Sequence, residues 1–394
     1  MDMQHLVMGV EDYTQQHLPQ YLTELTALCA IDSYSYYKPG LDEMAIYLAA
    51  RMRGLGMDAT IVEREHEGND LLGSLRGDGH GTILLIGHTD TVYPVGIATE
   101  RPVRHEGNFL LGPGVSDMKG GILLGIYAIE ALLAQGYRSF REIRFLCVSD
   151  EETNSRHSKD VIEQACQHCD AAFVLEAARA NGDIVSARKG SAFYILTAHG
   201  RSAHAGVEPE KGLNAIVELA HQVLQFQSLN GWRKGITVNA GTFIGGTAPN
   251  VVPDLAQVQF DLRFLRDKDR IATEQRWREM MRQQQVADVE LTLTHTSDCK
   301  EPMVATPATL QLAERAQEIA QMLGFPLEHT LTGGSSDASY TSGYGIPTLD
   351  GLGPIGGHDH SPNEYLKVNS VASRAALLAG LIASVGRFFC LRPF

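Results

Sequence analysis

A run of four aliphatic residues, followed at once by a histidine and an aspartate, constrains the fold of this chain more than any other feature. The run, Ile83–Ile86, is typical of a strand that is buried on both faces of a parallel sheet. Gly87 ends the run, and His88 and Asp90 follow two positions apart, so an extended chain projects both side chains to the same side. Because open α/β sheets form their functional crevice at the carboxyl ends of such strands, this stretch predicts an α/β domain with polar side chains at one sheet edge. One His near one Asp is equally typical of a surface loop.

Two other apolar runs end in the same way. Ile143–Val148 precedes Glu151 and Glu152, and Ala171–Leu175 precedes Glu176. If the three runs are strands of one sheet, these acids gather with His88 at a single edge, where their like charges repel one another unless cations are present. Solvated loop acids are the alternative, but three such strand ends favour a metal site.

Further candidate ligands lie on other segments. Asp117 begins an almost wholly apolar segment, and His358 and His360 lie near the C-terminus in the sequence GGHDHSPNEY. Two His and several carboxylates, without a usable set of Cys, favour zinc or a similar divalent ion. The set is too large for one catalytic zinc that keeps an open position, so it predicts two metal ions that are about 3.5–4 Å apart and share a carboxylate.

The doubled acid Glu151-Glu152 suggests a division of roles. One Glu can bind a metal ion while its neighbour takes the proton from metal-bound water. A polar turn is the ordinary alternative for such a pair.

The order of the predicted elements indicates two domains, one inserted into the other, as a length of 394 residues also suggests. After about residue 188 the pattern changes to strand-helix-strand-strand-helix-strand, which is the ferredoxin-like order. We therefore predict the fold class α/β, with a catalytic domain at 1–188 and 300–394 and an inserted ferredoxin-like α+β domain at 189–299. The catalytic domain should contain a mixed, mainly parallel sheet flanked by helices. The predicted helices are 11–30, 41–55, 118–135, 158–168, 212–228, 268–285, 307–323 and 369–388, and the predicted strands are 58–63, 70–76, 83–86, 143–148, 171–175, 190–199, 236–245, 256–264, 288–295 and 347–351.

Composition excludes several classes of partner. The formal net charge is −14, which argues against nucleic acid or an anionic membrane surface. No signal peptide is evident, and no apolar run is expected to approach the roughly 20 residues of a membrane span. Six scattered cysteines in so long a chain suggest a reducing compartment, which predicts a cytoplasmic location. Cys166 and Cys169 have the spacing of half a zinc site or of a redox pair, but they have no second pair to match, so structural thiols are expected.

Taken together, the motifs resemble one family along essentially the whole chain. They are GHTDTV, GPGVSDMKGG, SDEET, the Leu-Glu pair at 175–176, GRSAHAG, NVVPD and HSPNEY. They resemble the dinuclear zinc exopeptidase and deacylase family, which includes aminoacylase, acetylornithine deacetylase and succinyl-diaminopimelate desuccinylase. Residues 171–264 and the loop at Thr332 resemble its glutamate carboxypeptidase (carboxypeptidase G) type in particular.

The resemblance implies a role for each residue of the metal centre. His88 and Glu176 would hold one Zn²⁺, Glu152 and His360 would hold the other, and Asp117 would bridge them beside a cis peptide bond to Met118; Co²⁺ or Mn²⁺ could replace zinc. Asp90 would orient His88, and Glu151 would be the general base. His358 is the alternative to His360, but the family pattern His-Ser/Asp-x-x-Glu matches the sequence that begins at His360.

The inserted domain carries further residues of the family. The resemblance implies that His204 stabilises the oxyanion, commonly from the partner subunit of a homodimer, so this domain would serve as a dimerisation and lid domain. Asn250 and Arg263 would bind the terminal carboxylate of the substrate. The backbone N–H groups of Gly333 and Gly334, which precede a predicted helix, could also bind a carboxylate. A phosphate loop is the alternative for that segment, but the chain has no GxxxxGK[ST].

The expected function is hydrolysis of an amide bond next to a free α-carboxylate, in a small peptide or an N-acyl amino acid. A narrow deacylase or dipeptidase of the same family is the first alternative, and a non-catalytic homologue is the second. One departure concerns specificity: carboxypeptidase G relatives have a basic residue before a proline where the chain leaves the inserted domain, and here Glu301 precedes Pro302. A preference for glutamate therefore does not follow.

Overall fold

The computed structural model describes residues 2–388 and divides the chain into two compact units. The first unit contains the residues up to Ala187, Val304–Leu331 and the residues from Ser336 onward. The second unit contains Arg188–Met303 and the short segment Thr332–Ser335. It thus begins one residue before the expected boundary, extends past residue 299, and takes in Gly333 and Gly334, which we had expected in the catalytic part.

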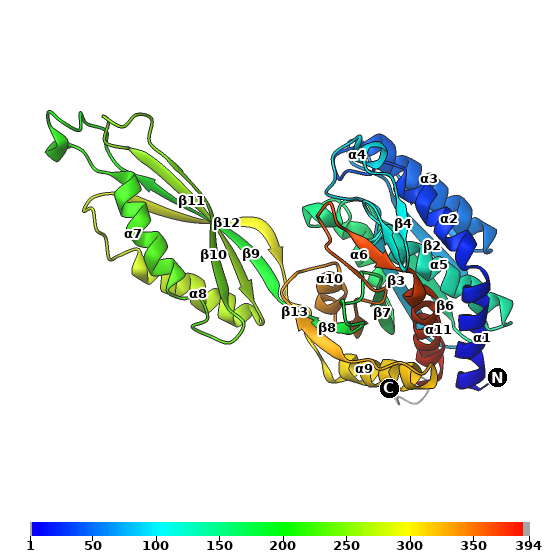
Figure 1. Cartoon of the computed structure of the whole chain (residues 1–394). Helices are drawn as coiled ribbons and strands as arrows, with labels where there is room; N and C mark the ends of the chain where they lie inside the picture. Colours follow the sequence, from blue (N-terminus) through cyan, green and yellow to red (C-terminus); the bar gives the residue numbers. More distant parts are fainter. Residues whose placement is uncertain (1, 389–394) are drawn as a thin grey trace. The chain divides into compact units, whose positions relative to one another are not determined.

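A six-stranded sheet forms the centre of the first unit (Figure 1). Its order is β1-β2-β6-β3-β7-β14. The β1–β2 and β2–β6 pairs are antiparallel, whereas β6–β3, β3–β7 and β7–β14 are parallel, so the predicted mixed, mainly parallel sheet is confirmed. The strands are β1 (Asp58–Val62), β2 (Asp70–Arg76), β3 (Thr82–His88), β6 (Glu142–Val148), β7 (Ala171–Val174) and β14 (Thr348–Leu349).

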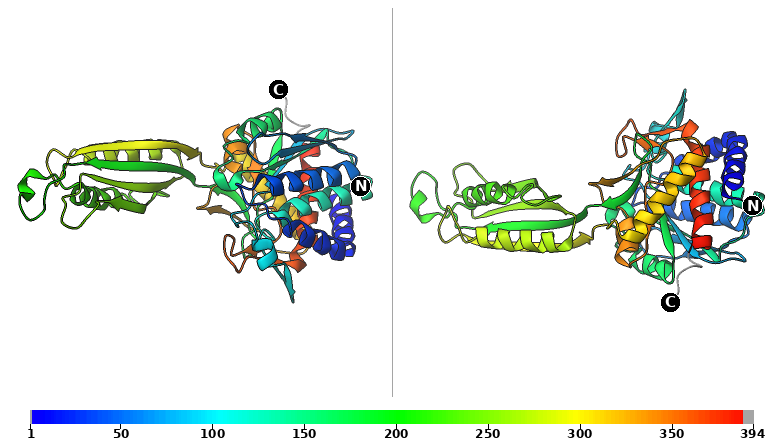
Figure 2. Two further views of the ribbon diagram at one scale, coloured as in Figure 1. Left: turned by 90° about the horizontal axis from the view of Figure 1, so that it is seen from above. Right: turned by 90° about the horizontal axis from the view of Figure 1, so that it is seen from below.

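Helices flank this sheet, as predicted (Figure 1, Figure 2). They are α1 (Met3–Gln16), α2 (Leu18–Cys29), α3 (Lys38–Gly54), α4 (Ile97–Glu100), α5 (Lys119–Ala134), α6 (Lys159–Cys166), α9 (Pro307–Met322), α10 (Ala338–Gly343) and α11 (Val371–Phe388), with 3₁₀ turns η1 (Glu151–Thr153) and η3 (Val368–Ser370). β3 lies between its parallel neighbours β6 and β7, and α5 packs against it. Every residue of Thr82–His88 is buried. The continuous aliphatic run therefore does mark a central strand.

The expected first helix was wrong. The segment 11–30 is not one helix, because α1 ends at Gln16 and α2 begins at Leu18. Pro19 stands at the start of α2, where its missing N–H costs nothing, but within a longer helix it would remove a hydrogen bond.

The expected absence of a membrane-length apolar run was also wrong by composition. The 18-residue window Val368–Val385 has a mean hydropathy of 1.5. By length and composition alone, a helix over this window could cross a membrane. However, 89% of that window is buried inside the protein, which is the environment of a core helix.

Short strands that the sequence pattern did not predict complete the first unit. A small four-stranded sheet has the order β15-β16-β5-β4, and β8 pairs with β13. The last residues of β8 and β13, Arg188 and Thr332, are counted with the second unit. These strands are β4 (Arg104–Glu106), β5 (Phe109–Leu111), β8 (Ile184–Arg188), β13 (His329–Thr332), β15 (Gly356–Gly357) and β16 (Tyr365–Lys367). All six are two to five residues long, too short for a hydrophobic period to show.

The second unit has the predicted ferredoxin-like fold. Its elements are β9 (Gly190–His199), η2 (Pro209–Lys211), α7 (Ala215–Gln227), β10 (Thr237–Gly245), β11 (Leu255–Phe264), α8 (Asp267–Met280) and β12 (Glu290–Lys300). The sheet order β10-β11-β9-β12, antiparallel throughout, is that of the split βαβ arrangement. Phe226 of α7 stacks on Trp277 of α8 with ring centroids 4.8 Å apart, and both pack against Phe260 of β11.

Candidate metal centre

Three neighbouring strands deliver their terminal residues to one edge of the central sheet. Because β6, β3 and β7 are parallel neighbours, their carboxyl ends coincide. His88 is the last residue of β3 and pairs in register with Val148 of β6. Glu151 and Glu152 begin η1 just after β6, and Glu176 follows β7. The predicted gathering of these residues at one sheet edge is therefore present.

Asp117 reaches this edge from the start of α5, through close packing of the helix. A Cβ on Gly121 would lie 1.9 Å from the carbonyl oxygen of Leu175, so the first turn of α5 lies directly against the segment that leads to Glu176. The peptide bond between Asp117 and Met118 is cis, as the resemblance implied.

The two carboxylate oxygens of Asp117 face two different histidines. Oδ1 lies 3.0 Å from Nε2 of His88, and Oδ2 lies 3.1 Å from Nε2 of His360. Nε2 of His88 also lies 3.8 Å from Oε1 of Glu176, and Nε2 of His360 lies 3.1 Å from Oε1 of Glu152. Asp117 thus stands between one His–Glu pair and another, as a carboxylate shared by two ions would.

The charges of this cluster suit cations. Burial, together with the charge of Asp117, raises the pKa of Glu176 well above its usual value and raises the pKa of Glu152 to about 7. Hydrogen bonds to Asp117 and Glu152 raise the pKa of His360 to about 11. Without metal ions, these raised pKa values favour bound protons, which offset the negative charge of the carboxylates. Divalent ions would supply positive charge in place of those protons. Ligand atoms of His88, Asp117 and Glu152, and likewise of His88, Glu151 and Glu176, lie within 4.8 Å of one another.

Asp90 orients both His88 and the doubled acid. Nδ1 of His88 lies 2.9 Å from the backbone oxygen of Asp90 and 3.3 Å from its Oδ1. Nδ1 therefore carries the ring proton and donates it to Asp90, which leaves Nε2 for a metal ion. The fully buried Asp90 carboxylate also accepts hydrogen bonds from the backbone N–H of Glu151 at 3.1 Å and of Glu152 at 3.2 Å. Ser35 donates to it at 2.7 Å.

Glu364 was quoted in the sequence only as the end of a motif, yet it is one of the most connected side chains of the centre. It is 1% exposed, and it accepts hydrogen bonds from the backbone N–H groups of Gly114, Ser116 and Asp117 and from the hydroxyl of Tyr93. A single Glu in a polar loop normally indicates exposure, so no hydropathy signal could have found it.

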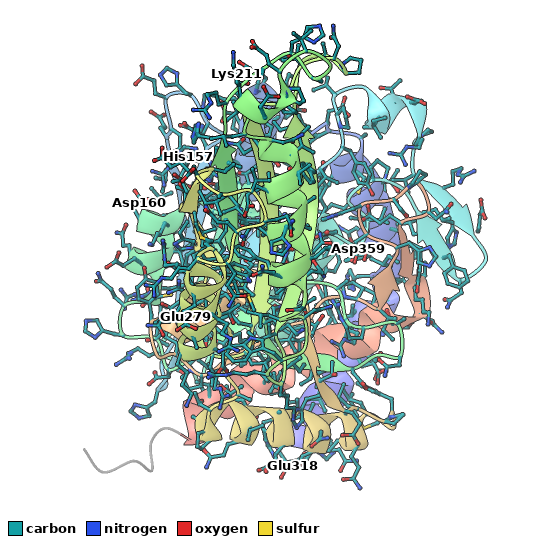
Figure 3. The ribbon with its side chains drawn as sticks, turned by 90° about the vertical axis from the view of Figure 1, so that its left-hand side faces the viewer. His157, Asp160, Lys211, Glu279, Glu318 and Asp359 are labelled. Carbon is teal, nitrogen blue, oxygen red and sulfur yellow. The ribbon has the colours of Figure 1, made fainter. Side chains whose placement is uncertain are left out.

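His360, not His358, joins the cluster, as the motif comparison favoured. His358 is exposed, and its ring packs edge-on against Tyr365 with centroids 5.5 Å apart. Asp359 lies between the two histidines in the loop that joins β15 to β16 (Figure 3).

The other predicted site residues all belong to the second unit. His204 is exposed, its Nδ1 accepts a hydrogen bond from the N–H of Gly206 at 3.1 Å, and its backbone forms a bridge with Val251, next to Asn250. Lys211 of η2, a few residues farther along this loop, lies at one end of the second unit (Figure 3). Arg263, the last residue but one of β11, forms an ion pair with Asp261 at 2.8 Å.

The loop with Gly333 and Gly334 differs in detail from the expected anion cradle. The carbonyl of Gly334 accepts a hydrogen bond from the Arg188 guanidinium at 3.1 Å. The predicted helix that follows is present as Ala338–Gly343, with Asp337 at its N-cap, but it is only six residues long. Binding of a carboxylate by these N–H groups stays a prediction.

Cys166 and Cys169 show no sign of reactivity. Burial raises the pKa of Cys166 to about 12 and of Cys169 to about 11, and both are free thiols. This agrees with the expectation of structural thiols for this pair; Cys390 lies outside the described residues.

Comparison with known proteins finds the same likeness over both units. Residues 84–384 match the model of peptidase family M20/M25/M40. Carboxypeptidase G2 of Pseudomonas sp. (strain RS-16) is 28% identical over 93% of this chain and 90% of its own length. Succinyl-diaminopimelate desuccinylase of Alkalilimnicola ehrlichii is 27% identical over 85% of this chain and 92% of its own. Among solved structures, aminopeptidase PepT from Bacillus cereus superposes with a TM-score of 0.81 at 24% identity, covering 94% of this chain and 99% of that one.

Proposed function

Because this chain belongs to peptidase family M20/M25/M40, and so is a metal-binding hydrolase that acts on peptides or acyl amino acids, we propose that it cleaves an amide bond next to a free α-carboxylate. The substrate would be a small peptide, cut at its C-terminus, or an N-acyl amino acid. One observation carries the catalytic part of this proposal: Asp117 presents one oxygen to His88 and the other to His360, at 3.0 and 3.1 Å.

We assign two divalent ions to this centre, and we propose zinc, with Co²⁺ or Mn²⁺ as replacements. His88 and Glu176 would hold one ion, Glu152 and His360 the other, and Asp117 both. When bound, the pair would polarise the scissile carbonyl and lower the pKa of the attacking water. The donor set of imidazoles and carboxylates is one that zinc accepts.

Glu151 would act as the proton carrier of the reaction. Its carboxylate lies within 4.8 Å of donor atoms of His88 and Glu176, and its backbone N–H is held by Asp90. Glu151 would take a proton from the attacking water and pass it to the leaving amine, since an amide cannot release an unprotonated amine anion.

The second unit would supply the remaining contacts. His204 would donate a hydrogen bond to the oxyanion, and Asn250 and Arg263 would bind the α-carboxylate, with the N–H groups of Gly333 and Gly334 as further donors. Arg263 is only 26% exposed and shares its charge with Asp261, which would orient the guanidinium.

We also propose a homodimer formed through the second unit. β10 is an edge strand, and it exposes Phe243 (45%) and Ile244 (64%), while α7 exposes Leu224 (74%). An edge strand with exposed apolar residues favours pairing with a second copy, which would bring His204 to the partner's metal centre.

A narrow N-acyl amino acid deacylase is the second candidate, and the presence of Glu301 before Pro302 favours it over a glutamate-specific carboxypeptidase. A non-catalytic role is disfavoured, because the cluster contains all five candidate ligands together with Glu151.

The test is a screen of dipeptides and N-acyl amino acids on protein loaded with Zn²⁺, Co²⁺ or Mn²⁺. Each substrate is paired with its C-terminal amide, which lacks only the α-carboxylate charge. We expect the free acids to be cleaved and the amides to be poor substrates. Equal cleavage of both members of each pair contradicts the proposal.

Glu151→Gln is the matched variant for this screen. It should keep both metal ions and lose turnover by about 10²–10⁴-fold, because it removes the base and no ligand. Near-native turnover in a metal-loaded variant would show that Glu151 is not the base.

A further inference from the structure

A buried carboxylate outside the ligand set joins the two loops that bring Asp117 and His360 to the metal centre. Oε1 of Glu364 accepts hydrogen bonds from the backbone N–H of Ser116 at 2.8 Å and of Asp117 at 3.0 Å. Oε2 accepts from the backbone N–H of Gly114 at 3.0 Å. Glu364 itself belongs to the loop of His360, four residues farther along the chain.

Tyr93 ties the same carboxylate to the backbone beside His360. Its hydroxyl lies 2.8 Å from Oε2 of Glu364 and 3.0 Å from the carbonyl oxygen of Ser361. The ring is buried, with 9% exposed, and the Arg101 guanidinium lies 5.0 Å from its centroid. The phenol therefore shares Oε2 of Glu364 with the backbone N–H of Gly114 and links this carboxylate to the backbone of the His360 loop.

The contacts need a carboxylate and not merely a polar side chain. Three backbone donors and one hydroxyl converge on two oxygens, and an ionised carboxylate is a pure acceptor. A glutamine of the same shape would turn one oxygen into a donor, which faces N–H groups that are themselves donors and are shielded from water. The turn from Gly114 to Asp117 would then have to move.

Resting on the proposed two-metal function, we infer that Glu364 is a positioning residue that sets the placement of Asp117 relative to His360 and so sets the affinity for the metal pair. It holds the backbone nitrogen of Asp117 directly, and it anchors the loop of His360 through its own backbone and through Tyr93. Neither carboxylate oxygen of Glu364 is needed as a metal ligand, because each oxygen already accepts two hydrogen bonds from the protein.

The test compares Glu364→Gln with Glu218→Gln, a matched control in the second unit. Glu218 is also fully buried, and one of its oxygens accepts hydrogen bonds from the backbone N–H groups of Gln285 and Val286, both at 2.7 Å. Both variants remove one acceptor from a buried carboxylate, but only Glu364 touches the segment of a candidate metal ligand.

Two quantities are measured: the melting temperature of the metal-free protein and the affinity for Zn²⁺ in competition with a chromophoric chelator. We expect Glu364→Gln to bind Zn²⁺ about 10–100-fold more weakly, the usual effect of losing an outer partner of a metal ligand. Its Co²⁺ absorption spectrum should also change. Glu218→Gln should lower the melting temperature and leave Zn²⁺ affinity and the Co²⁺ spectrum unchanged.

Native Zn²⁺ affinity in a folded Glu364→Gln variant overturns the inference, as does an equal loss of affinity in Glu218→Gln. If Glu364→Gln does not fold, Tyr93→Phe decides, because it keeps the carboxylate and removes one donor; it should weaken Zn²⁺ binding by a factor of about 2–10, as expected for one net hydrogen bond. Unchanged affinity in that variant also overturns the inference. If the unaltered protein binds no metal pair, the proposed function fails instead, and the two failures are thereby distinguished.

Discussion

The backbone nitrogen of Glu151 lies 3.1 Å from Oδ1 of Asp90, and this hydrogen bond joins the end of β3 to the end of β6. The other oxygen of Asp90 accepts from the N–H of Glu152 at 3.2 Å, and Oδ1 also lies 3.3 Å from Nδ1 of His88. One buried carboxylate therefore orients a candidate ligand of each metal ion and the candidate base. The resemblance had implied only its contact with His88.

Asp90→Asn should reduce kcat/KM by about 10–100-fold, because an amide cannot accept from both N–H groups and the turn that carries Glu151 and Glu152 must shift. Steady-state kinetics of the metal-loaded variant measure this loss. Asp170→Asn is the control: Asp170 accepts from the N–H of Thr82 at 2.8 Å, at the other end of β3, and its loss should leave kcat/KM unchanged. Full activity in Asp90→Asn would refute the role assigned to this carboxylate.

Asp117→Ala should remove both metal ions together, because Asp117 is the one side chain that contacts both His88 and His360 within hydrogen-bond distance among the described residues. Metal analysis after gel filtration gives the stoichiometry. Glu176→Ala and Glu152→Ala are the controls, and each should weaken one ion more than the other. Loss of one equivalent in Asp117→Ala, with the second held at native affinity, argues against a shared carboxylate.

Much of this centre could be predicted from the sequence for a simple physical reason. A strand buried on both faces must be continuously apolar, so β3, β6 and β7 are visible as runs, and polar residues directly after them must lie at a sheet edge. The inserted unit was equally visible, because its strands alternate and its order of elements is distinctive.

What could not be predicted depends on contacts between distant segments. Nothing near Glu364 in the sequence indicates that its carboxylate lies against residues 114–117, and hydropathy assigns it to the surface. The strands of the β15-β16-β5-β4 sheet are too short to show an alternation of apolar and polar residues. They are defined by their pairing with one another. The break between α1 and α2 is a local effect of Pro19. The apolar residues keep helical spacing across this break, so their spacing alone does not indicate it.

Metal affinity should rise with pH between about 6 and 8. Without metal, the pKa of Glu152 is raised to about 7 by burial and that of His360 to about 11 by its hydrogen bonds with Asp117 and Glu152, so both groups carry protons that a metal ion must displace. Each proton released makes the affinity increase about tenfold per pH unit. Competition titrations with a chelator at pH 6, 7 and 8 measure the slope. His360→Ala should bind more weakly and show a smaller slope, and an affinity independent of pH in the unaltered protein contradicts this account.

His204 is exposed on the second unit, and its Nδ1 accepts a hydrogen bond from the backbone N–H of Gly206. A metal pair meets one side of the tetrahedral intermediate, so another donor is needed for its developing negative charge. His204→Ala should stay folded, dimeric and metal-loaded but lose turnover by about 10²–10³-fold. Mixing it with Glu151→Ala protein under subunit exchange should restore activity, because one site of the mixed dimer then receives Glu151 from one chain and His204 from the other. The control is each variant exchanged with itself, which should stay inactive. If exchange is demonstrated by mass and no activity returns, His204 does not serve the partner's site.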